Sequence, residues 1–411
     1  MTQRYDTYKD SGVQWLGEIP GHGGCVFINR LFNIKAGGDV KPELYADKKD
    51  ENHPFPVYTN TKSADDVYAY TSLATCPSNS ITVTGRGEVG HAIFRETPYD
   101  AIVRLLSLTP KSNIICKFYA YFIDTVIPFS SDSAAIGQLS AVQIKQKHVT
   151  LPPLSEQRSI VSFLDAKCGK IDEWVTKKQK EVEHLQELKQ RVIVDAVTRG
   201  LNPHVKMKAT NIPWLKEIPE HWECVKLKMF CQDNKEKNKG NIESCVLSLS
   251  YGNIIVKKNV NFGLVPENYD SYQIVNPGNI ILRLTDLQND HKSLRTGLVK
   301  NRGIITSAYV GLIVKNMNSE YTQLILHSYD VMKVFYGMGG GLRQSMSYTD
   351  IANVYIPVPP LSEQKQIVSY LDAKTSQIDK LIAHITKEIE CIKEYKQRLI
   401  SEVVTGQIKV C

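Results

Sequence analysis

The hexapeptide Pro152-Pro153-Leu154-Ser155-Glu156-Gln157 opens a stretch of sequence that this chain contains twice. It returns as Pro359-Pro360-Leu361-Ser362-Glu363-Gln364, and the residues behind the two copies keep matching in one register without a gap. Leu164-Asp165-Ala166-Lys167, for instance, returns as Leu371-Asp372-Ala373-Lys374. Roughly half of the positions in this span are identical, which indicates an internal duplication.

Each copy predicts helix. The Pro-Pro pair discourages helix before it, and Ser155 and Ser362 are predicted as N-caps, each with a carboxylate beside it at the positive end of the helix dipole. We expect a short helix first and then a second, longer helix that begins near Ile171 and Ile378.

The longer segments carry a narrow apolar stripe with the 4-3-4-3 spacing of a coiled-coil seam. In the first copy its members are Ile171, Val175, Lys178, Val182, Leu185, Lys189, Val192 and Ala196. In the second copy they are Ile378, Ile382, Ile385, Ile389, Ile392, Lys396, Leu399 and Val403. Each helix would have about 28 residues and a length of roughly 40 Å. We expect the two to pack on each other as an antiparallel coiled coil; the alternative is that each lies on the core of its own domain.

The duplication extends over the whole half-chain. Trp15-Leu16-Gly17-Glu18-Ile19-Pro20 returns as Trp214-Leu215-Lys216-Glu217-Ile218-Pro219. The segment that follows the first helix, residues 200–205, resembles the C-terminal residues 406–410. The end of the second half is therefore expected near the start of the first, which would close a pseudo-two-fold repeat.

The segments between these repeated parts barely resemble each other. Both are rich in short β-prone runs that turn residues interrupt, and each contains one short helical pattern. The predicted fold class is α+β: two domains with small, twisted, mostly antiparallel sheets, joined by the two long repeated helices. The predicted divisions are residues 1–150 for the first domain, 151–206 for a central helical spacer, 207–357 for the second domain and 358–411 for a C-terminal helical spacer.

Composition restricts the class of protein. The chain has 411 residues, 42% of them hydrophobic and 23% charged, an ordinary balance for a globular protein. A formal net charge of +7 permits a nucleic-acid partner without establishing one. No signal peptide and no long apolar run are evident. Nine cysteines with no Cys-x-x-Cys pattern indicate reduced thiols, so a cytoplasmic location is expected.

Motifs for catalysis are missing from the sequence. Gly85-x-Gly87-x-x-Gly90 matches a dinucleotide fingerprint, but the residues after it predict a strand, so we interpret it as a hairpin turn. No methyltransferase motif, zinc pattern or nucleophile elbow is present. Asp286 and Asp290 near Lys292 imitate a nuclease cluster without its spacing. We expect neither an enzyme nor a bound metal or cofactor.

What remains is an inventory of polar side chains of the kinds that contact DNA bases and phosphates. In the first domain the candidates are Tyr58, Asn60, Thr61, Lys62, Arg86 and Gln138. In the second domain they are Arg283, Thr285, Asp286, Asn289, His291, Lys292 and Arg295, with Arg343 and Gln344 behind a glycine-rich loop. The alternative for each is a solvated loop residue.

These features together resemble the DNA-specificity subunit of Type I restriction–modification systems. The resemblance rests on the doubled Pro-Pro-Leu-Ser-Glu-Gln helices and the doubled Trp-Leu-x-Glu-Ile-Pro segments, and it covers nearly the whole chain. Gly85-Arg86-Gly87 and the segment from Gly341 to Ser345 match recurrent parts of the family's variable domains. One departure is Gly23: Trp222 stands in the second copy, and the family usually has Trp.

The resemblance implies two target recognition domains, each of which reads one half of a bipartite, asymmetric site in double-stranded DNA. It also implies that the helices set the spacing and dock two methyltransferase subunits, with Glu156, Gln157, Glu363 and Gln364 as candidate partner-binding residues. Motor-nuclease subunits would join this complex. S-adenosylmethionine, ATP and Mg would then be bound by the partner subunits and none of them by this chain.

Three rival interpretations stay open at the level of sequence. The chain could be a coiled-coil interaction scaffold that does not read DNA. It could be a self-contained nuclease, which would cleave DNA with a metal alone. It could also be a degenerate specificity subunit that assembles but no longer supports restriction.

Overall fold

The computed structural model describes residues 4–129, 138–257, 268–287, 294–338 and 345–410. The chain divides into two compact units. The first unit is Met1–Gln179 with Lys387–Cys411, and the second is Lys180–Thr386. Each unit therefore contains one β-rich domain and part of both long helices. Among the described residues, no helix is long and apolar enough to cross a membrane.

The first unit is built around a four-stranded antiparallel sheet of strand order β4-β11-β8-β9. Helix α2 (Cys116–Thr125) packs on this sheet and fills the core with Phe118, Tyr119 and Phe122. The strands of the main sheet are β4 (Phe32–Ala36), β8 (Ser80–Val83), β9 (Ala92–Arg95) and β11 (Leu106–Pro110).

Smaller sheets complete the first unit. Hairpin β1-β2 and the pair β3-β12 are antiparallel, and a second four-stranded sheet has the order β10-β6-β7-β5. Short helices α1 (Ile28–Leu31), η1 (Pro42–Leu44) and α3 (Ala141–Lys145) connect these elements. The strands are β1 (Tyr8–Asp10), β2 (Glu18–Pro20), β3 (Gly24–Phe27), β5 (Tyr45–Ala46), β6 (Phe55–Tyr58), β7 (Ala69–Thr71), β10 (Asp100–Ala101) and β12 (His148–Leu151).

The second unit has the corresponding antiparallel sheet, of order β16-β23-β20-β21, covered by helix α5 (Ser319–Val331). Its other pairs are β13-β14, β15-β24, β17-β18 and β19-β22. The strands are β13 (Met207–Ile212), β14 (Leu215–Pro219), β15 (Glu223–Lys226), β16 (Cys231–Asp233), β17 (Leu247–Ser250), β18 (Asn253–Val256), β19 (Gln273–Val275), β20 (Ile280–Leu282), β21 (Thr296–Leu298), β22 (Gly303–Ile305), β23 (Val310–Val314) and β24 (Tyr355–Val358). Short helices η2 (Leu227–Met229), η3 (Val334–Gly337) and α6 (Tyr348–Ile351) complete it.

The two domains share the topology of the main sheet, the opening hairpin and the strand pair before the long helix, although their sequences diverge. Hairpin β13-β14 corresponds to β1-β2, the pair β15-β24 corresponds to β3-β12, and α5 corresponds to α2. Even the short helices match: Ser140 and Ser347, at the same offset as the hexapeptides, each form a capping box at the start of α3 and α6. The predicted α+β class with small, mostly antiparallel sheets is confirmed; among the described strands, only β10 with β6 is parallel.

The long helices differ in one respect from the prediction. α4 (Leu154–Arg199) has 46 residues and α7 (Leu361–Val404) has 44, and each is one continuous helix. The expected division into a short and a long helix is wrong, because no proline or cap interrupts the chain and the apolar stripe continues back to Ile160 and Ile367. The predicted N-caps are also wrong: both helices begin one residue before Ser155 and Ser362, which lie inside the first turn.

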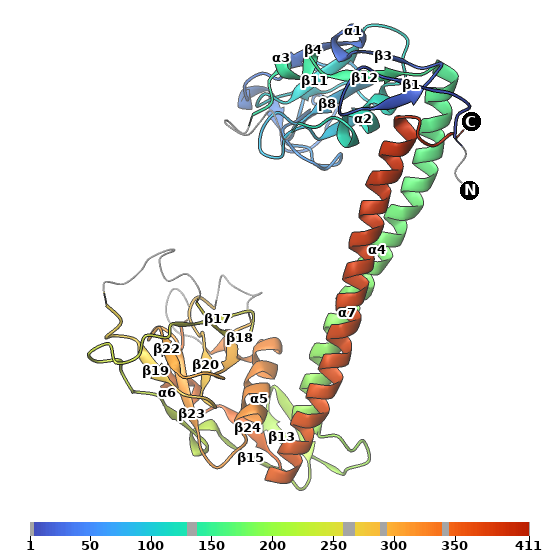
Figure 1. Cartoon of the computed structure of the whole chain (residues 1–411). Helices are drawn as coiled ribbons and strands as arrows, with labels where there is room; N and C mark the ends of the chain where they lie inside the picture. The colour runs from blue at the N-terminus through green and yellow to red at the C-terminus, as the bar shows by residue number, and fades with distance from the viewer. Residues whose placement is uncertain (1–3, 130–137, 258–267, 288–293, 339–344, 411) are drawn as a thin grey trace. The chain divides into compact units, whose positions relative to one another are not determined.

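In both units α4 and α7 lie side by side and run antiparallel (Figure 1). In the first unit, Ile160 and Leu164 of α4 share a core cluster with Leu399, Val403 and other residues near the end of α7. In the second unit, the far end of α4 packs against the start of α7 through Val197 and Ile367. All predicted seam positions are buried or half-buried, which confirms the coiled-coil stripe.

The lysines within the seam form matching ion pairs. Lys396 of α7 binds both carboxylate oxygens of Asp172 on α4 at 2.7 Å in the first unit. In the second unit Lys189 of α4 binds Asp379 of α7 at the same distances. These four residues occupy equivalent positions of the repeat. In both pairs the lysine lies in the apolar seam of one helix, and its ammonium binds an aspartate of the facing helix. The pairs fit only an antiparallel arrangement in this register.

The C-terminus meets the beginning of the chain within the first unit, as the repeat predicts. Tyr8 donates to the carbonyl oxygen of Gly406 at 2.9 Å, and the Gln407 amide donates to that of Glu18 at 2.8 Å. In the second unit, Gly200 lies against Pro219 and Trp222 in the equivalent place. The first repeat is thus completed by the last residues of the chain.

The glutamine of each hexapeptide connects the long helix to its domain. Gln157 accepts a hydrogen bond from the Ile115 amide at 3.0 Å and donates to the Pro152 carbonyl at 2.8 Å. Gln364 does the same with the Asn318 amide and the Pro359 carbonyl, both at 2.9 Å. Both side chains are buried. Gln157 and Gln364 therefore hold the start of α2 or α5 and are not available to a partner, contrary to the prediction.

The glutamates beside them face inward as well. Glu156 accepts hydrogen bonds from His22 at 2.8 Å and from the Tyr5 hydroxyl. Glu363 accepts from His221 at 2.9 Å and from the Trp222 indole at 3.1 Å. The candidate partner-binding role of this pair is likewise not supported, because the opening segment of each repeat already occupies the carboxylate.

The Gly23 departure is compensated within the first unit. Trp222 is fully buried in the second unit, whereas a small hollow in the first unit is lined by Gly23, Ile160 and Val404. Tyr5 supplies the hydrogen bond to Glu156 that Trp222 supplies to Glu363. A residue from outside the repeated motif thus replaces the missing donor, while the volume of the indole is not fully replaced.

Replacing Gln364 by alanine is expected to destabilise the second unit by about 1–3 kcal/mol, because it leaves the part-buried amide of Asn318 and the buried carbonyl of Pro359 without their partner. Urea unfolding of the full chain, followed by tryptophan fluorescence, measures the change. Gln366→Ala is the matched control: this glutamine is exposed on the same turn and should change stability by less than about 0.5 kcal/mol. Equal effects of the two variants would contradict the assignment.

Candidate nucleic-acid interface

Three segments of the first unit meet beyond the end of strand β8. They are the β8-β9 turn (residues 84–91), the loop of residues 59–66, and the short stretch at Gln138 and Leu139. Arg86 and Gln138 form an antiparallel bridge, and the Leu139 amide donates to the Gly85 carbonyl at 2.8 Å. We call these three segments the first loop cluster.

The glycines of the β8-β9 turn serve its backbone geometry. Gly87 and Gly90 have φ of +69° and +93°, the left-handed region that favours glycine. A Cβ at Gly85 would come within 2.8 Å of the Arg104 carbonyl oxygen and 3.0 Å of that of Leu139. Strands β8 and β9 pair directly on either side. The hairpin-turn interpretation is confirmed, and the dinucleotide fingerprint does not lead into a helix here.

Asn60 joins the loop to the turn. Its side-chain oxygen accepts from the amides of Gly85 at 2.7 Å and Arg86 at 3.2 Å, and its nitrogen donates to the Val103 carbonyl at 2.8 Å. All of these partners are backbone groups of this domain. Asn60 thus positions Arg86. Because its side-chain amide is bound to these backbone groups, it supports the turn.

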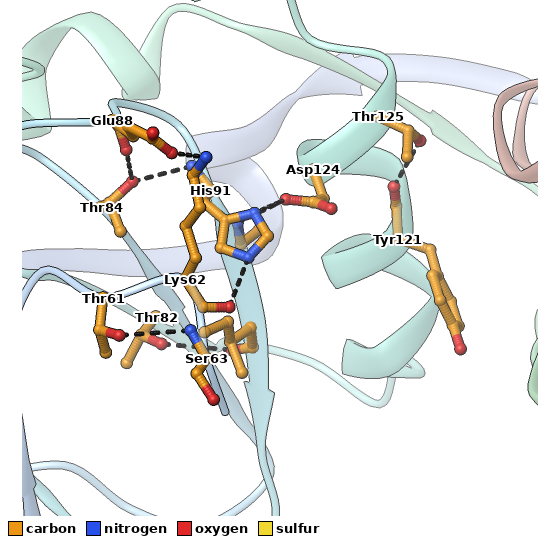
Figure 2. Close-up of polar contacts among 12 residues, drawn as sticks. Thr61, Lys62, Ser63, Thr82, Thr84, Glu88, His91, Tyr121, Asp124 and Thr125 are labelled. Atoms are coloured by element: carbon orange, nitrogen blue, oxygen red, sulfur yellow. Dashed lines mark hydrogen bonds and ion pairs between the residues drawn. The ribbon is translucent and has the colours of Figure 1, made fainter. Parts of the chain in front are cut away.

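His91 lies between the loop and helix α2, as Figure 2 shows. Its Nδ1 is 2.5 Å from Asp124 of α2, and its Nε2 is 2.9 Å from the carbonyl oxygen of Lys62. The Thr84 hydroxyl accepts from the His91 amide at 2.9 Å and donates to the Glu88 carbonyl at 2.5 Å. The Lys62 ammonium pairs with Glu88 across the turn. The loop and the turn are therefore held together by polar side chains.

Arg95, at the end of β9, holds the other side of the loop. It is buried, with its guanidinium 3.5 Å from the ring centroid of Tyr58, and it donates to the Ala64 carbonyl at 2.9 Å and to the Thr82 hydroxyl at 3.1 Å. Burial lowers the pKa of Arg95 from its ordinary value. Tyr58 is buried under this guanidinium, so it is not exposed for the predicted DNA contact.

The remaining candidates of the first domain face solvent to different degrees. Arg86 and Lys62 are exposed, and Thr61 and Gln138 are half-buried. Thr61 donates to Asp66 at 2.7 Å. The structure thus brings five of the six predicted residues into one cluster, with Arg86 and Lys62 as its exposed cations.

The second unit has the equivalent arrangement, which we call the second loop cluster: residues 283–287 after β20 and the stretch at Met346. The Met346 amide donates to the Leu284 carbonyl at 2.8 Å, as Leu139 does to Gly85. Arg283, Thr285 and Asp286 are half-buried here. Asn289, His291, Lys292, Arg343 and Gln344 lie outside the described residues.

Arg295 differs from the prediction. It is fully buried, and its guanidinium donates to the carbonyls of Arg283 at 3.0 Å, Thr285 at 2.8 Å and Asp286 at 3.3 Å. Because these donors are bound to carbonyl groups of the same loop cluster, the guanidinium cannot read a base edge. Arg295 is therefore a support of the second loop cluster.

Sequence reasoning missed the residues that support these clusters. By residue type and spacing, His91, Arg95 and Asp124 do not differ from other polar residues of the first domain. His91 and Arg95 bind carbonyl groups of a distant loop, and Asp124 accepts from the His91 ring and the Ala92 amide. No spacing rule indicates these partners. Within the described ranges, no group of three His, Cys, Asp or Glu residues could hold a metal ion.

Comparison with known proteins identifies the family. The profile of the Type I restriction modification DNA specificity domain matches residues 26–184 and 219–391, one match for each repeat. A Methanocaldococcus jannaschii protein assigned as the specificity subunit of type I restriction enzyme MjaX is 27% identical over 326 residues, 75% of this chain and 72% of the relative. The MjaVIII specificity subunit of the same organism is 25% identical over 327 residues, 74% of this chain and 73% of that one.

Solved structures support the fold. A chain from a structure described as the basis of complex assembly and conformational transition of the type I R-M system has a TM-score of 0.68 to this chain at 13% identity. The likeness covers 94% of this chain and 98% of the other. Two matched domains, one for each repeat, and a shared fold over nearly the full length lead to one conclusion: the chain belongs to the DNA specificity subunits of Type I restriction–modification systems.

Proposed function

We propose that each domain reads one half of a bipartite, asymmetric DNA site through its loop cluster. One observation carries the proposal: the two domains form their loop clusters at the same place in the fold but with different residues. Both units put a turn after the central strand beside the stretch before α3 or α6. The first presents Arg86, Gln138 and Lys62 there, and the second presents Arg283, Thr285 and Asp286. Side chains of these kinds bind base edges and phosphates.

The helices α4 and α7 are proposed to set the gap between the two half-sites and to dock two methyltransferase subunits. The support comes from the repeat of the two helices. The Lys189–Asp379 and Lys396–Asp172 pairs are equivalent, so the helix pair carries the same arrangement of residues twice. Two copies of one partner can bind two equivalent surfaces. Motor-nuclease subunits would complete the complex, and S-adenosylmethionine, ATP and Mg would be bound by the partners. This chain would act without catalysing a reaction itself.

Sequencing of methylated bases in cellular DNA tests the proposal. Cells that carry this chain with its own methyltransferase subunit are compared with cells that lack only this chain. A new methylated motif of two short blocks with a fixed gap supports it. Unchanged methylation, with the complex shown to assemble, would favour an interaction scaffold that does not read DNA.

Arg86→Ala is expected to reduce methylation at the complete site by about 10- to 100-fold, since a lost base contact costs about 1–3 kcal/mol. Arg86 is the exposed cation of the β8-β9 turn, at its bridge with Gln138. The rate of methyl transfer by the assembled complex to a duplex with the identified site measures the loss. Lys9→Ala, at an exposed position of strand β1 in the same unit, is the control and should leave the rate within about twofold. Equal rates for the two variants would exclude Arg86 as a DNA contact.

A further inference from the structure

His91 lies between two groups that can only accept hydrogen bonds. One is the carboxylate of Asp124 at 2.5 Å from Nδ1, and the other is the carbonyl oxygen of Lys62 at 2.9 Å from Nε2. A neutral imidazole carries a hydrogen on one nitrogen, so one of the two contacts would set a lone pair against a lone pair. Both contacts are satisfied together by the imidazolium form. Figure 2 shows the ring between its two acceptors.

The groups around the ring favour this form on balance. Asp124 faces it from α2, and the Lys62 ammonium in the loop pairs with Glu88 of the turn. The hydrogen bond with Asp124 raises the pKa of His91 above its ordinary value of 6.5, against the opposing effects of burial and of the Lys62 charge. Asp124 also accepts from the Ala92 amide at 3.0 Å. The carboxylate is therefore fixed in place by the strand before it binds the ring.

The protonated ring joins three elements of the first unit. Through Asp124 it contacts helix α2, through its backbone it belongs to the β8-β9 turn, and through Lys62 it holds the loop of residues 59–66. Loss of the contact with the Lys62 carbonyl leaves that loop attached by Asn60, by Arg95 and by the ion pair between the Lys62 ammonium and Glu88. The Lys62–Glu88 pair is exposed to solvent and such pairs contribute little to stability, so the backbone at the centre of the loop is held chiefly by His91.

The second domain places a permanent cation at the same position. The Thr84 amide donates to the His91 carbonyl across the first turn, and the Arg283 amide donates to the Arg295 carbonyl across the second, both at 2.9 Å. The Arg295 amide donates to Asp330 of α5 at 2.7 Å, and its guanidinium holds the carbonyls of its loop. Each domain thus has a cationic side chain near an acid of its covering helix, with donors directed at loop carbonyls.

We propose that His91, in its doubly protonated form, is the positioning residue of the first loop cluster, so that recognition of the first half-site weakens as the ring loses a proton. The second half-site, supported by Arg295, keeps its recognition over the same pH range. This inference rests on the proposed function of the two domains. The direction follows from linkage: the contribution is complete below the ordinary pKa of histidine and is lost as pH rises through the raised pKa of the folded state.

The test uses the full chain assembled with its methyltransferase subunit, between pH 6 and pH 9. The wild type is compared with His91→Gln, which is neutral at every pH, and His91→Arg, which is charged at every pH and copies the second domain. The KM for a duplex with the identified site is measured beside kcat. Hydrogen exchange of residues 59–66 is measured on the same proteins, since it reports the loop without DNA.

The wild type is expected to lose DNA affinity by about tenfold across this range, in KM rather than in kcat. His91→Gln should show the high KM at every pH, and His91→Arg should keep the low KM at pH 9. Protection of residues 59–66, relative to His91→Arg at the same pH, should follow the same pattern. Parallel pH profiles for the three proteins in exchange and in KM would overturn the inference. Methylation that ignores both half-sites, with the exchange pattern present, would overturn only the proposed function.

Discussion

Trp222→Ala is expected to lower the free energy of unfolding of the second unit by about 3–5 kcal/mol, the usual cost of removing a fully buried large aromatic side chain. The indole is fully buried and its Nε1 donates to Glu363 at 3.1 Å. The ring also lies against Gly200 at the end of α4, where a Cβ would come within 3.1 Å of it. The substitution opens a cavity at the point where α4, α7 and the opening hairpin of the second repeat meet.

Thermal and urea unfolding of the full chain measure the loss, which should appear in the transition of the second unit. Trp15→Ala is the matched control, because Trp15 belongs to the corresponding opening segment of the first repeat and is 36% exposed. Its effect should stay below about 1 kcal/mol. Comparable destabilisation by the two variants would mean that burial of Trp222 does not have the role assigned to it.

Inserting one heptad into each long helix, after Gln179 in α4 and after Thr386 in α7, is expected to change the recognised DNA motif itself. Seven residues keep the seam in phase and lengthen both helices by about 10 Å. That length corresponds to at most about three base pairs of DNA. The methylated motif should keep its two blocks while its gap grows by about one to three base pairs, and the original motif should no longer be methylated.

Base-modification sequencing of cellular DNA measures the gap directly. The control replaces exposed residues of the same helix turns without changing their number, and it should leave the motif unchanged. An unchanged gap in the lengthened protein would mean that the helices do not set the spacing. The Lys189–Asp379 and Lys396–Asp172 pairs remain intact in the design, so a failure to fold is not the expected outcome.

The sequence alone determined the parts of this protein whose structure depends on local, repeated interactions. The doubled hexapeptide and the seam spacing predicted the antiparallel helices, and the seam lysines are explained by Asp172 and Asp379 at equivalent positions. The strand pattern after the glycines predicted the β8-β9 hairpin, and the positive φ of Gly87 and Gly90 fits its turn. A pattern with a fixed period or a fixed turn chemistry needs no knowledge of distant residues.

Only the tertiary structure decided which polar residues support the fold and which face solvent. Gln157 and Gln364 hold helix starts, Tyr58 and Arg295 are buried, and His91 holds a loop through a backbone carbonyl. By residue type alone, each of them could equally well contact DNA. The difference depends on which carbonyls and amides the fold brings within 3 Å, and residues far apart in the chain determine that. A buried polar group must find such a partner, and its identity is a property of the folded chain rather than of the local sequence.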